Sequence, residues 1–195
     1  MTRTIPALLV SFALAMPAPA ASGPLVVAPP PVRMVAASGA PAVPVAVAPL
    51  PAAATPLQPW AGTFSAEAAA TGVPLGLLLA VAMVESGGDP TARSSAGAVG
   101  LLQVLPVAHP HLCPCGAAAN NIRAGAIILA RYAALAGASP ACLASGPGGT
   151  SGCARATDRA LSAYNQGPNA PGVRWGYVQR VRADWVRIAR EEAAA

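Results

Sequence analysis

Residues 74–88 read PLGLLLAVAMVESGG, and this stretch decides the kind of fold that the chain can form. A proline in the first turn, a long apolar run and two closing glycines are typical of a helix that starts near Pro74. Glu85 stands seven positions after Leu78 and four after Val81, so it lies on the apolar face of that helix. The stretch therefore predicts a buried helix that carries a carboxyl group near its end.

The carboxyl group of Glu85 has two interpretations. Burial disfavours the charged form and raises the pKa, which keeps an acid protonated near neutral pH for proton donation. Alternatively, the helix end frays and exposes Glu85 to water. The residues that follow favour the first interpretation, because they carry a recognisable pattern.

Four segments in order resemble the signatures of the Slt-type lytic transglycosylases of the lysozyme-like superfamily. Residues 85–106 read ESGGDPTARSSAGAVGLLQVLP and match an E-S, a Pro, a Ser, G-A-x-G-L-x-Q and a Pro without a gap. NIRAG at 121–125, AYNQGP at 163–168 and YVQRV at 177–181 are similar to the family's N-I-x-x-G, A-Y-N-x-G-P and Y-V-x-R-V motifs. Together the four segments span most of the predicted folded part.

This resemblance implies a mainly α-helical, lysozyme-like single domain in which Glu85 is the catalytic acid and base. It also implies a cleft for peptidoglycan glycan strands, lined by Ser94, Gln103, Tyr164, Asn165 and Tyr177. Hydroxyl and amide side chains suit the hydrogen bonds of sugars and N-acetyl groups, and a tyrosine ring offers a flat face with a polar tip. Ordinary structural roles stay open: turn formation for Ser94 and Asn165, a surface position for Gln103, and core packing for Tyr177.

The reaction that the resemblance implies is non-hydrolytic cleavage of the β-1,4 bond between N-acetylmuramic acid and N-acetylglucosamine, which leaves a 1,6-anhydromuramyl end. Ordinary glycosidases use two carboxylates, and Asp89 is the only other acid close in sequence to Glu85. We interpret Asp89 as a loop or capping residue. Glu85 alone then acts as acid and afterwards as base, with no metal or cofactor. Two alternatives stay open: a hydrolytic muramidase that uses Asp89 directly, and a non-catalytic glycan-binding domain of a secretion or conjugation apparatus.

The N-terminal third differs in composition from the rest. Residues 1–21 resemble a secretory signal peptide. Arg3 supplies the positive charge at the start, a short apolar run follows, and Ala-Pro-Ala forms a cleavage site. Residues 22–59 are almost entirely Pro, Ala and Val, and proline removes backbone donors. We expect a disordered linker there that acts as a tether or is unselected low-complexity filler. The folded domain then covers residues 60–192.

Several further elements are expected along the folded part. No alternating strand pattern of useful length occurs. The predicted helices cover residues 65–71, 99–104, 120–136, 156–164 and 177–190, and a Gly/Ser/Pro loop covers residues 138–150.

Charge and hydropathy bear on location and partners. The chain has 12 basic residues, all arginine, against 7 acidic ones. A positive exported protein suits the anionic cell wall, whereas scattered arginines disfavour nucleic acid as a partner.

No apolar run reaches the roughly 18 residues of a membrane span. We expect a periplasmic or cell-wall protein without a membrane span in its mature form, and its small size fits local wall opening for a secretion or conjugation apparatus.

The four cysteines predict one disulfide bond. Export favours oxidation, and the helix predicted over 120–136 separates Cys113 and Cys115 from Cys142 and Cys153 by about 25 Å. A local Cys142–Cys153 bond across a flexible loop is therefore expected, while Cys113 and Cys115 either form a small ring or stay reduced. A zinc site built from His109, His111 and the Cys113/Cys115 pair is the alternative, although the spacing is unlike the usual zinc motifs.

Overall fold

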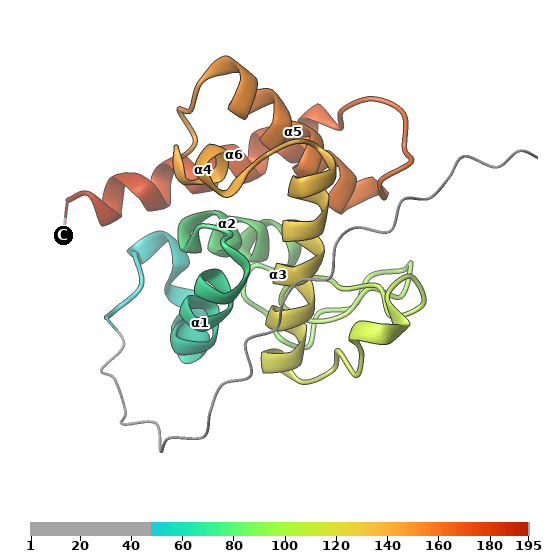
Figure 1. Cartoon of the computed structure of the whole chain (residues 1–195). Coiled ribbons are helices and arrows are strands. Elements are labelled where there is room, and N and C mark those ends of the chain that lie inside the picture. Colours follow the sequence, from blue (N-terminus) through green and yellow to red (C-terminus); the bar gives the residue numbers. More distant parts are fainter. Residues whose placement is uncertain (1–47, 195) are drawn as a thin grey trace, which may run out of the picture. The chain divides into compact units, whose positions relative to one another are not determined.

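The computed structural model describes residues 48–194, and the predicted signal peptide lies outside these residues (Figure 1). The prediction of a mainly α-helical domain is confirmed, since residues 48–194 form helices and two isolated bridges but no strand. None of the described helices is both long enough and apolar enough to cross a membrane. The elements are η1 (Ala52–Trp60), α1 (Ala61–Thr71), α2 (Leu75–Ser86), η2 (Pro110–Leu112), α3 (Ala118–Leu135), α4 (Pro140–Ala144), α5 (Ser151–Gln166) and α6 (Trp175–Glu192).

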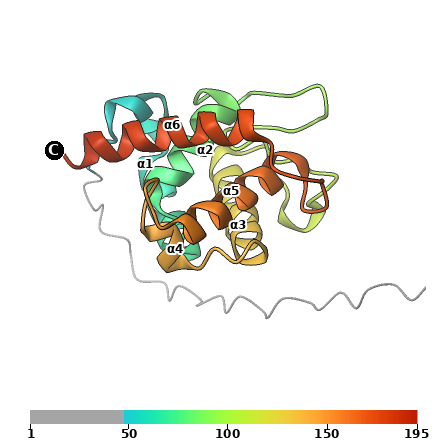
Figure 2. The same ribbon diagram turned by 90° about the horizontal axis from the view of Figure 1, so that it is seen from above.

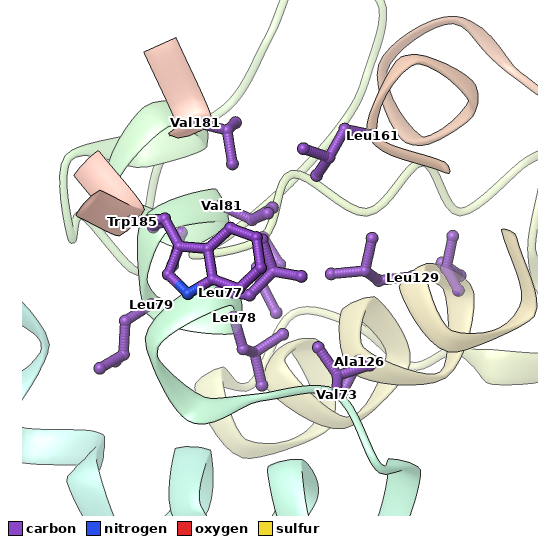
Figure 3. Close-up of a cluster of buried hydrophobic side chains, with 14 of the residues drawn as sticks. Val73, Leu77, Leu78, Leu79, Val81, Ala126, Leu129, Leu161, Val181 and Trp185 are labelled. Carbon is purple, nitrogen blue, oxygen red and sulfur yellow. The ribbon is translucent and has the colours of Figure 1, made fainter. Parts of the chain in front are cut away.

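Helix α2 lies at the centre of the core. All of its residues from Gly76 to Ala82 are buried, because α1, α6 and η1 all pack against it. Figure 3 shows Trp185 of α6, Leu129 of α3 and Leu161 of α5 among the side chains of this cluster. A helix that is apolar on all sides is stable only inside a protein. The middle of α2 is therefore enclosed on all sides, whereas Leu75 at its start and the last turn, which carries Glu85, are partly exposed.

Glycine ends α2 as the sequence predicts. Gly87 adopts a left-handed φ of 63°, and its N–H donates to the Met83 carbonyl at 2.9 Å. This conformation costs glycine little. The helix thus ends at Ser86, with Gly87 as its cap, and Glu85 is held in the last turn.

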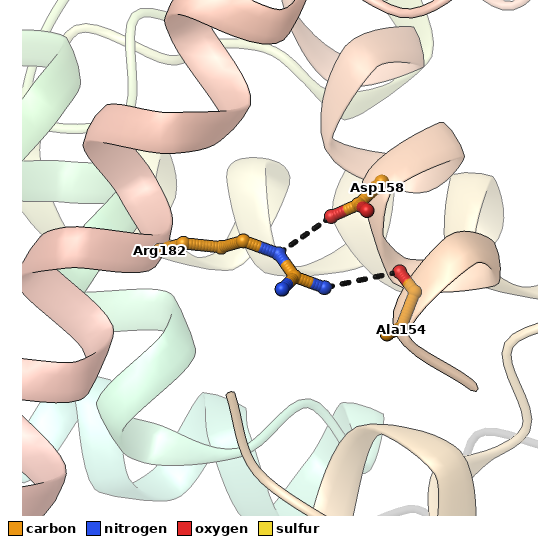
Figure 4. Close-up of polar contacts among 3 residues, drawn as sticks. All are labelled: Ala154, Asp158 and Arg182. Carbon is orange, nitrogen blue, oxygen red and sulfur yellow. Dashed lines mark hydrogen bonds and ion pairs between the residues drawn. The ribbon is translucent and has the colours of Figure 1, made fainter. Parts of the chain in front are cut away.

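Helices α3, α5 and α6 complete the domain. Figure 2 shows α6 alongside α2, and α3 packs against α1 and α5. Asp158 of α5 is buried and accepts a 2.6 Å hydrogen bond from Nε of Arg182 on α6, while Nη2 of Arg182 donates to the Ala154 carbonyl (Figure 4). This ion pair ties together the two helices that carry Tyr164 and Tyr177.

The predicted boundary at residue 60 is wrong for residues 52–59, which form the 3-10 helix η1. Leu57 is fully buried, and the Ala53 N–H donates to Oε2 of Glu191 at 2.8 Å. Proline content misled the prediction. A short 3-10 helix tolerates Pro56 and Pro59, because few of its N–H groups are needed, and small alanines with one leucine suffice to pack on α2 and α6.

The helix predicted over residues 99–104 is also wrong. This segment is a tight loop in which Val99 and Val104 exchange two 3.0 Å backbone hydrogen bonds. Gly97 and Gly100 have φ of 88° and 75°, and Gln103 has φ of 44°. A right-handed helix requires negative φ at every residue, so the apolar spacing of this segment reflects loop packing.

The loop predicted over residues 138–150 contains the short helix α4. Ser139 caps it by accepting a hydrogen bond from the Cys142 N–H at 3.2 Å, and Pro140 occupies its first position. The expected Cys142–Cys153 bond is present and joins α4 to α5. Cys113 and Cys115 are bonded to each other.

Candidate active site

A cavity of about 660 Å³ lies at the end of α2. Its wall comes from the last turn of α2, the loop after it, one face of α3 and the end of α5. The predicted site residues that line it are Glu85, Ser94, Gln103, Tyr164 and Asn165. Five residues that are far apart in the sequence are therefore brought to one surface.

Glu85 is partly buried in the wall of this cavity. Its Oε1 accepts a 2.7 Å hydrogen bond from the hydroxyl of Tyr177. Burial raises the pKa of Glu85 above its usual value, and the Tyr177 hydrogen bond and the charge of Arg180 partly oppose this rise. The alternative of a frayed, solvated helix end is therefore wrong.

Tyr177 is buried and does not line the cavity. It stands in the first turn of α6 and contacts Glu85 through its hydroxyl. Burial and the neighbouring Glu85 raise the pKa of Tyr177 well above its usual range, so the phenol keeps its proton and remains a donor. The sequence named Tyr177 as a substrate-binding candidate and left core packing open; in the structure it is a buried side chain that is hydrogen-bonded to Glu85.

Three side chains from three helices hold the loop over residues 99–104. Ser86 of α2 donates to the Leu101 carbonyl at 2.9 Å, and Tyr164 of α5 donates to the Leu102 carbonyl at 2.8 Å. Asn121 of α3 is fully buried and accepts from the Leu102 N–H at 2.7 Å. Its amide also donates to the carbonyls of Val99 at 2.8 Å and Cys115 at 3.2 Å. Residues from three of the four motif segments therefore hold one loop in place.

Two glycines allow this loop to approach α3. A Cβ at Gly100 would lie 2.7 Å from the side chain of Asn121, and a Cβ at Gly125 would lie 2.5 Å from Leu102 Cδ1. Carbon atoms cannot approach so closely without displacement. Gly100 therefore makes room for the Asn121 side chain, and Gly125 makes room for the Leu102 side chain in the core.

Gln103 and Ser94 stabilise the wall that they line. Nε2 of Gln103 donates to the carbonyls of Ala92 at 3.1 Å and Gly100 at 3.0 Å. Oγ of Ser94 accepts from the Ala98 N–H at 3.0 Å. The Nε2 donors of Gln103 are used by the loop. Its carbonyl oxygen can therefore accept a hydrogen bond from an N–H or O–H group of a ligand.

Asp89 lies outside the set of residues that line the cavity. Its Oδ1 accepts from the N–H and the hydroxyl of Thr91, both at 2.7 Å, and these hydrogen bonds lower the pKa of the exposed carboxyl. Asp89 thus forms a local turn, which is the loop role that we expected for it.

Three basic residues of the cavity wall were missed as ligand-binding candidates, namely His109, His111 and Arg131. In the sequence, the two histidines suggested only zinc ligands. The two cysteines of that hypothetical site are bonded to each other, and no group of three possible metal ligands occurs among residues 48–194. The sequence of α3 alone does not show which of its faces turns to the cavity. Its cavity-facing residues follow one helix face, namely Ile128, Arg131, Tyr132 and Leu135.

The helical fold, and a cavity lined by a single carboxyl group among the described residues, agree with the lysozyme-like domain that the sequence predicts. The chain belongs to the transglycosylase SLT domain family, whose match covers residues 62–184. The resemblance drawn from the four motifs is thereby confirmed.

One similar solved structure is an inactive mutant of the lytic transglycosylase Slt from Pseudomonas aeruginosa. It shares 20% sequence identity with this chain at a TM-score of 0.42, over 68% of this chain and 21% of that one. The chain thus corresponds to about a fifth of that larger protein. No curated protein gives a significant match.

Proposed function

We propose that the chain cleaves the β-1,4 bond between N-acetylmuramic acid and N-acetylglucosamine in peptidoglycan, without water, and leaves 1,6-anhydromuramyl ends. One observation carries the proposal. Glu85 is the only carboxyl group among the described residues that line the cavity, and burial raises its pKa. A protonated carboxylic acid beside a polar cleft is suited to donate a proton to a glycosidic oxygen.

In the first step Glu85 acts as the acid. Its proton moves to the glycosidic oxygen while the bond from that oxygen to C1 of the muramyl residue breaks. Because Oε1 accepts the Tyr177 hydrogen bond, Oε2 is the oxygen that carries the transferred proton. The hydrogen bond also stabilises the carboxylate that forms.

In the second step the same group acts as the base. The muramyl C6 hydroxyl forms a bond to C1, and its proton returns to Glu85. No atom is gained or lost from the glycan, and Glu85 ends in its starting form. Arg180 supports this cycle, because its positive charge acts on Glu85 and favours the transient carboxylate.

The single-carboxylate route is supported by the position of Asp89. A hydrolytic glycosidase places its second carboxyl group about 5–10 Å from the first, across the scissile bond. Asp89 is exposed, bonded to Thr91 and outside the cavity wall. This arrangement favours internal attack by the C6 hydroxyl over attack by water.

Ser94, Gln103, Tyr164 and Asn165 are proposed to bind the glycan. The carbonyl oxygen of Gln103 suits an N-acetyl N–H or a sugar hydroxyl, and the exposed Asn165 offers an amide at the same surface. Tyr164 directs its hydroxyl to the Leu102 carbonyl. Its ring can therefore serve as a fixed apolar face for a sugar.

Export is part of the proposal, since peptidoglycan lies outside the cytoplasm. The predicted signal peptide over residues 1–21 and the Cys142–Cys153 bond both support a periplasmic or cell-wall location. Local wall opening for a secretion or conjugation apparatus is a hypothesis that the size of the chain suggests.

Mass analysis of the fragments released from purified peptidoglycan tests the proposal. We expect anhydromuramyl ends from the wild type, none from Glu85→Gln, and most of the wild-type yield from Asp89→Asn. Reducing ends would favour the hydrolytic muramidase. Glycan binding without release would favour the non-catalytic domain.

A further inference from the structure

The disulfide bond between Cys113 and Cys115 has no part in the proposed reaction, but it follows two residues after His111 of the cavity wall. It joins residues that are 2 positions apart, whereas Cys142–Cys153 joins residues 11 positions apart. A bond that closes so short a segment removes little freedom from the unfolded chain, so it adds less to global stability than the longer one. Its main effect is therefore expected in the local structure of the folded protein.

The bond joins a buried residue to a partly exposed one. Cys115 is 3% exposed and belongs to the core, and Cys113 packs against that core. The segment before the bond carries the two histidines of the cavity wall. Within the described part of the chain, every hydrogen bond formed by residues 106–114 stays within residues 105–115. This segment is therefore attached to the domain by packing and by its covalent link to Cys115.

Cys115 in turn contacts the residue that holds the neighbouring loop of the cavity wall. Nδ2 of Asn121 donates to the Cys115 carbonyl at 3.2 Å and to the Val99 carbonyl at 2.8 Å, while its Oδ1 accepts from the Leu102 N–H at 2.7 Å. Because Asn121 is fully buried, water cannot replace a contact that it loses. The disulfide is thus connected, through two residues, to the loop over residues 99–104.

Resting on the proposed function, we propose that the Cys113–Cys115 bond is a positioning element for the glycan-binding wall. It holds the Cys115 carbonyl against Asn121 and holds the cavity-lining segment against the core. Glu85 is held separately, by α2 and by the hydroxyl of Tyr177. Loss of the bond therefore weakens glycan binding and leaves the acid and base group in place.

Steady-state release of fragments from purified peptidoglycan separates these two effects. Cys113→Ser/Cys115→Ser should raise KM about fivefold, which corresponds to the loss of one hydrogen bond, and should change kcat less than about twofold. The falling limb of the pH–rate profile should not shift, because Tyr177 still binds Glu85. A protein that was only partly unfolded would instead show a lower kcat at the same KM, and that result would contradict the positioning role.

Cys142→Ser/Cys153→Ser is the matched control. It removes a bond of the same kind between α4 and α5, and neither cysteine lines the cavity. This variant should have the lower melting temperature of the two double variants, since its bond closes the longer segment, and its KM should equal that of the wild type. An unchanged KM in Cys113→Ser/Cys115→Ser, or the same rise in both variants, would overturn the inference.

In the Cys142→Ser/Cys153→Ser protein, dithiothreitol can act only on the Cys113–Cys115 bond. The dithiol supplies two electrons and two protons, so that two cysteine thiols form and dithiothreitol becomes a cyclic disulfide. KM should rise about fivefold in the reduced protein. It should return to its first value after dithiothreitol is removed and oxidised glutathione restores the bond. A KM that does not respond to reduction would refute the positioning role.

Hydrogen exchange tests the coupling without any glycan, so it separates this inference from the proposed reaction. Amides of residues 99–104 should exchange faster in Cys113→Ser/Cys115→Ser than in the wild type, because the contacts of Asn121 are loosened. Amides of α1 should exchange at the same rate in both proteins. Unchanged exchange of residues 99–104 would overturn the positioning role. Absence of anhydro products from the wild type refutes the reaction, and the exchange result still decides the role of the bond.

Discussion

The hydroxyl of Tyr177 donates a 2.7 Å hydrogen bond to Oε1 of Glu85, which stands 92 positions earlier in the chain. This contact joins the first turn of α6 to the last turn of α2. It fixes the orientation of a carboxyl group whose pKa burial raises. The contact therefore connects the packing of two helices to the chemistry of the site.

Tyr177→Phe should lower kcat about tenfold, because the acid loses the hydrogen bond that orients it. The pH profile gives a sharper signature. The acid form is required, so the rate falls as pH rises through the pKa of Glu85. The lost hydrogen bond had lowered that pKa, so the falling limb should move to higher pH. Rates over a pH series measure this shift.

Tyr164→Phe is the control for that profile. It removes a tyrosine hydroxyl whose hydrogen bond goes to the Leu102 carbonyl. Tyr164→Phe should raise KM but should not shift the falling limb of the pH–rate profile. An unchanged limb in Tyr177→Phe would show that the contact does not tune Glu85.

Asn121→Leu should destabilise the domain by about 3 kcal/mol, because the loop's N–H and carbonyl groups lose buried partners. Activity should fall as well, since the cavity wall is no longer held. Urea unfolding followed by circular dichroism measures the free energy. Asn120→Leu, at an exposed neighbouring position, should change stability by less than about 0.5 kcal/mol. Similar losses in the two variants would contradict the role of Asn121.

Asp158→Asn should lower the free energy of unfolding by about 2 kcal/mol, because Arg182 of α6 loses its charged partner on α5. The exposed pair of Asp184 and Arg187 provides the comparison. Asp184→Asn should cost about 0.5 kcal/mol or less, since solvent screens that pair. Thermal unfolding of both variants at low and high salt checks the difference. If the two variants lost the same amount of stability, the Asp158–Arg182 pair would contribute little to the stability of the domain.

Leu57→Ala should cost about 2–5 kcal/mol if η1 is part of the domain, since this side chain is fully buried. A deletion of residues 23–59 should therefore lower the melting temperature, contrary to what a free linker would predict. Val107→Ala, at a position 82% exposed, is the control and should leave stability nearly unchanged. A Leu57→Ala protein as stable as wild type would place the start of the domain after η1.

Local signals predicted much of the fold. The apolar run and Gly87 defined α2 within one residue of its observed bounds, because helix propensity and a left-handed cap act over a few residues. The family resemblance of the motifs also implied that Glu85, Gln103 and Tyr164 line one cleft, and the structure places all three in the wall of the same cavity. These features depend on short segments of sequence.

Other features depend on contacts between distant segments. The loop over residues 99–104 looked helical because its hydrogen bonds to Ser86, Asn121 and Tyr164 cannot be read locally. The contact of Tyr177 with Glu85 was missed for the same reason. Arg131 was missed because only the packing of α3 shows which of its faces turns to the cavity.

The central claim is that Glu85 breaks the glycan without water, and the oxygen at the new muramyl end tests it most directly. Peptidoglycan is digested in water labelled with heavy oxygen, and the muramyl ends are examined by mass spectrometry. Internal attack by the C6 hydroxyl predicts anhydromuramyl ends that carry no label, and no such ends from Glu85→Gln. Labelled reducing ends from the wild-type protein would contradict the account.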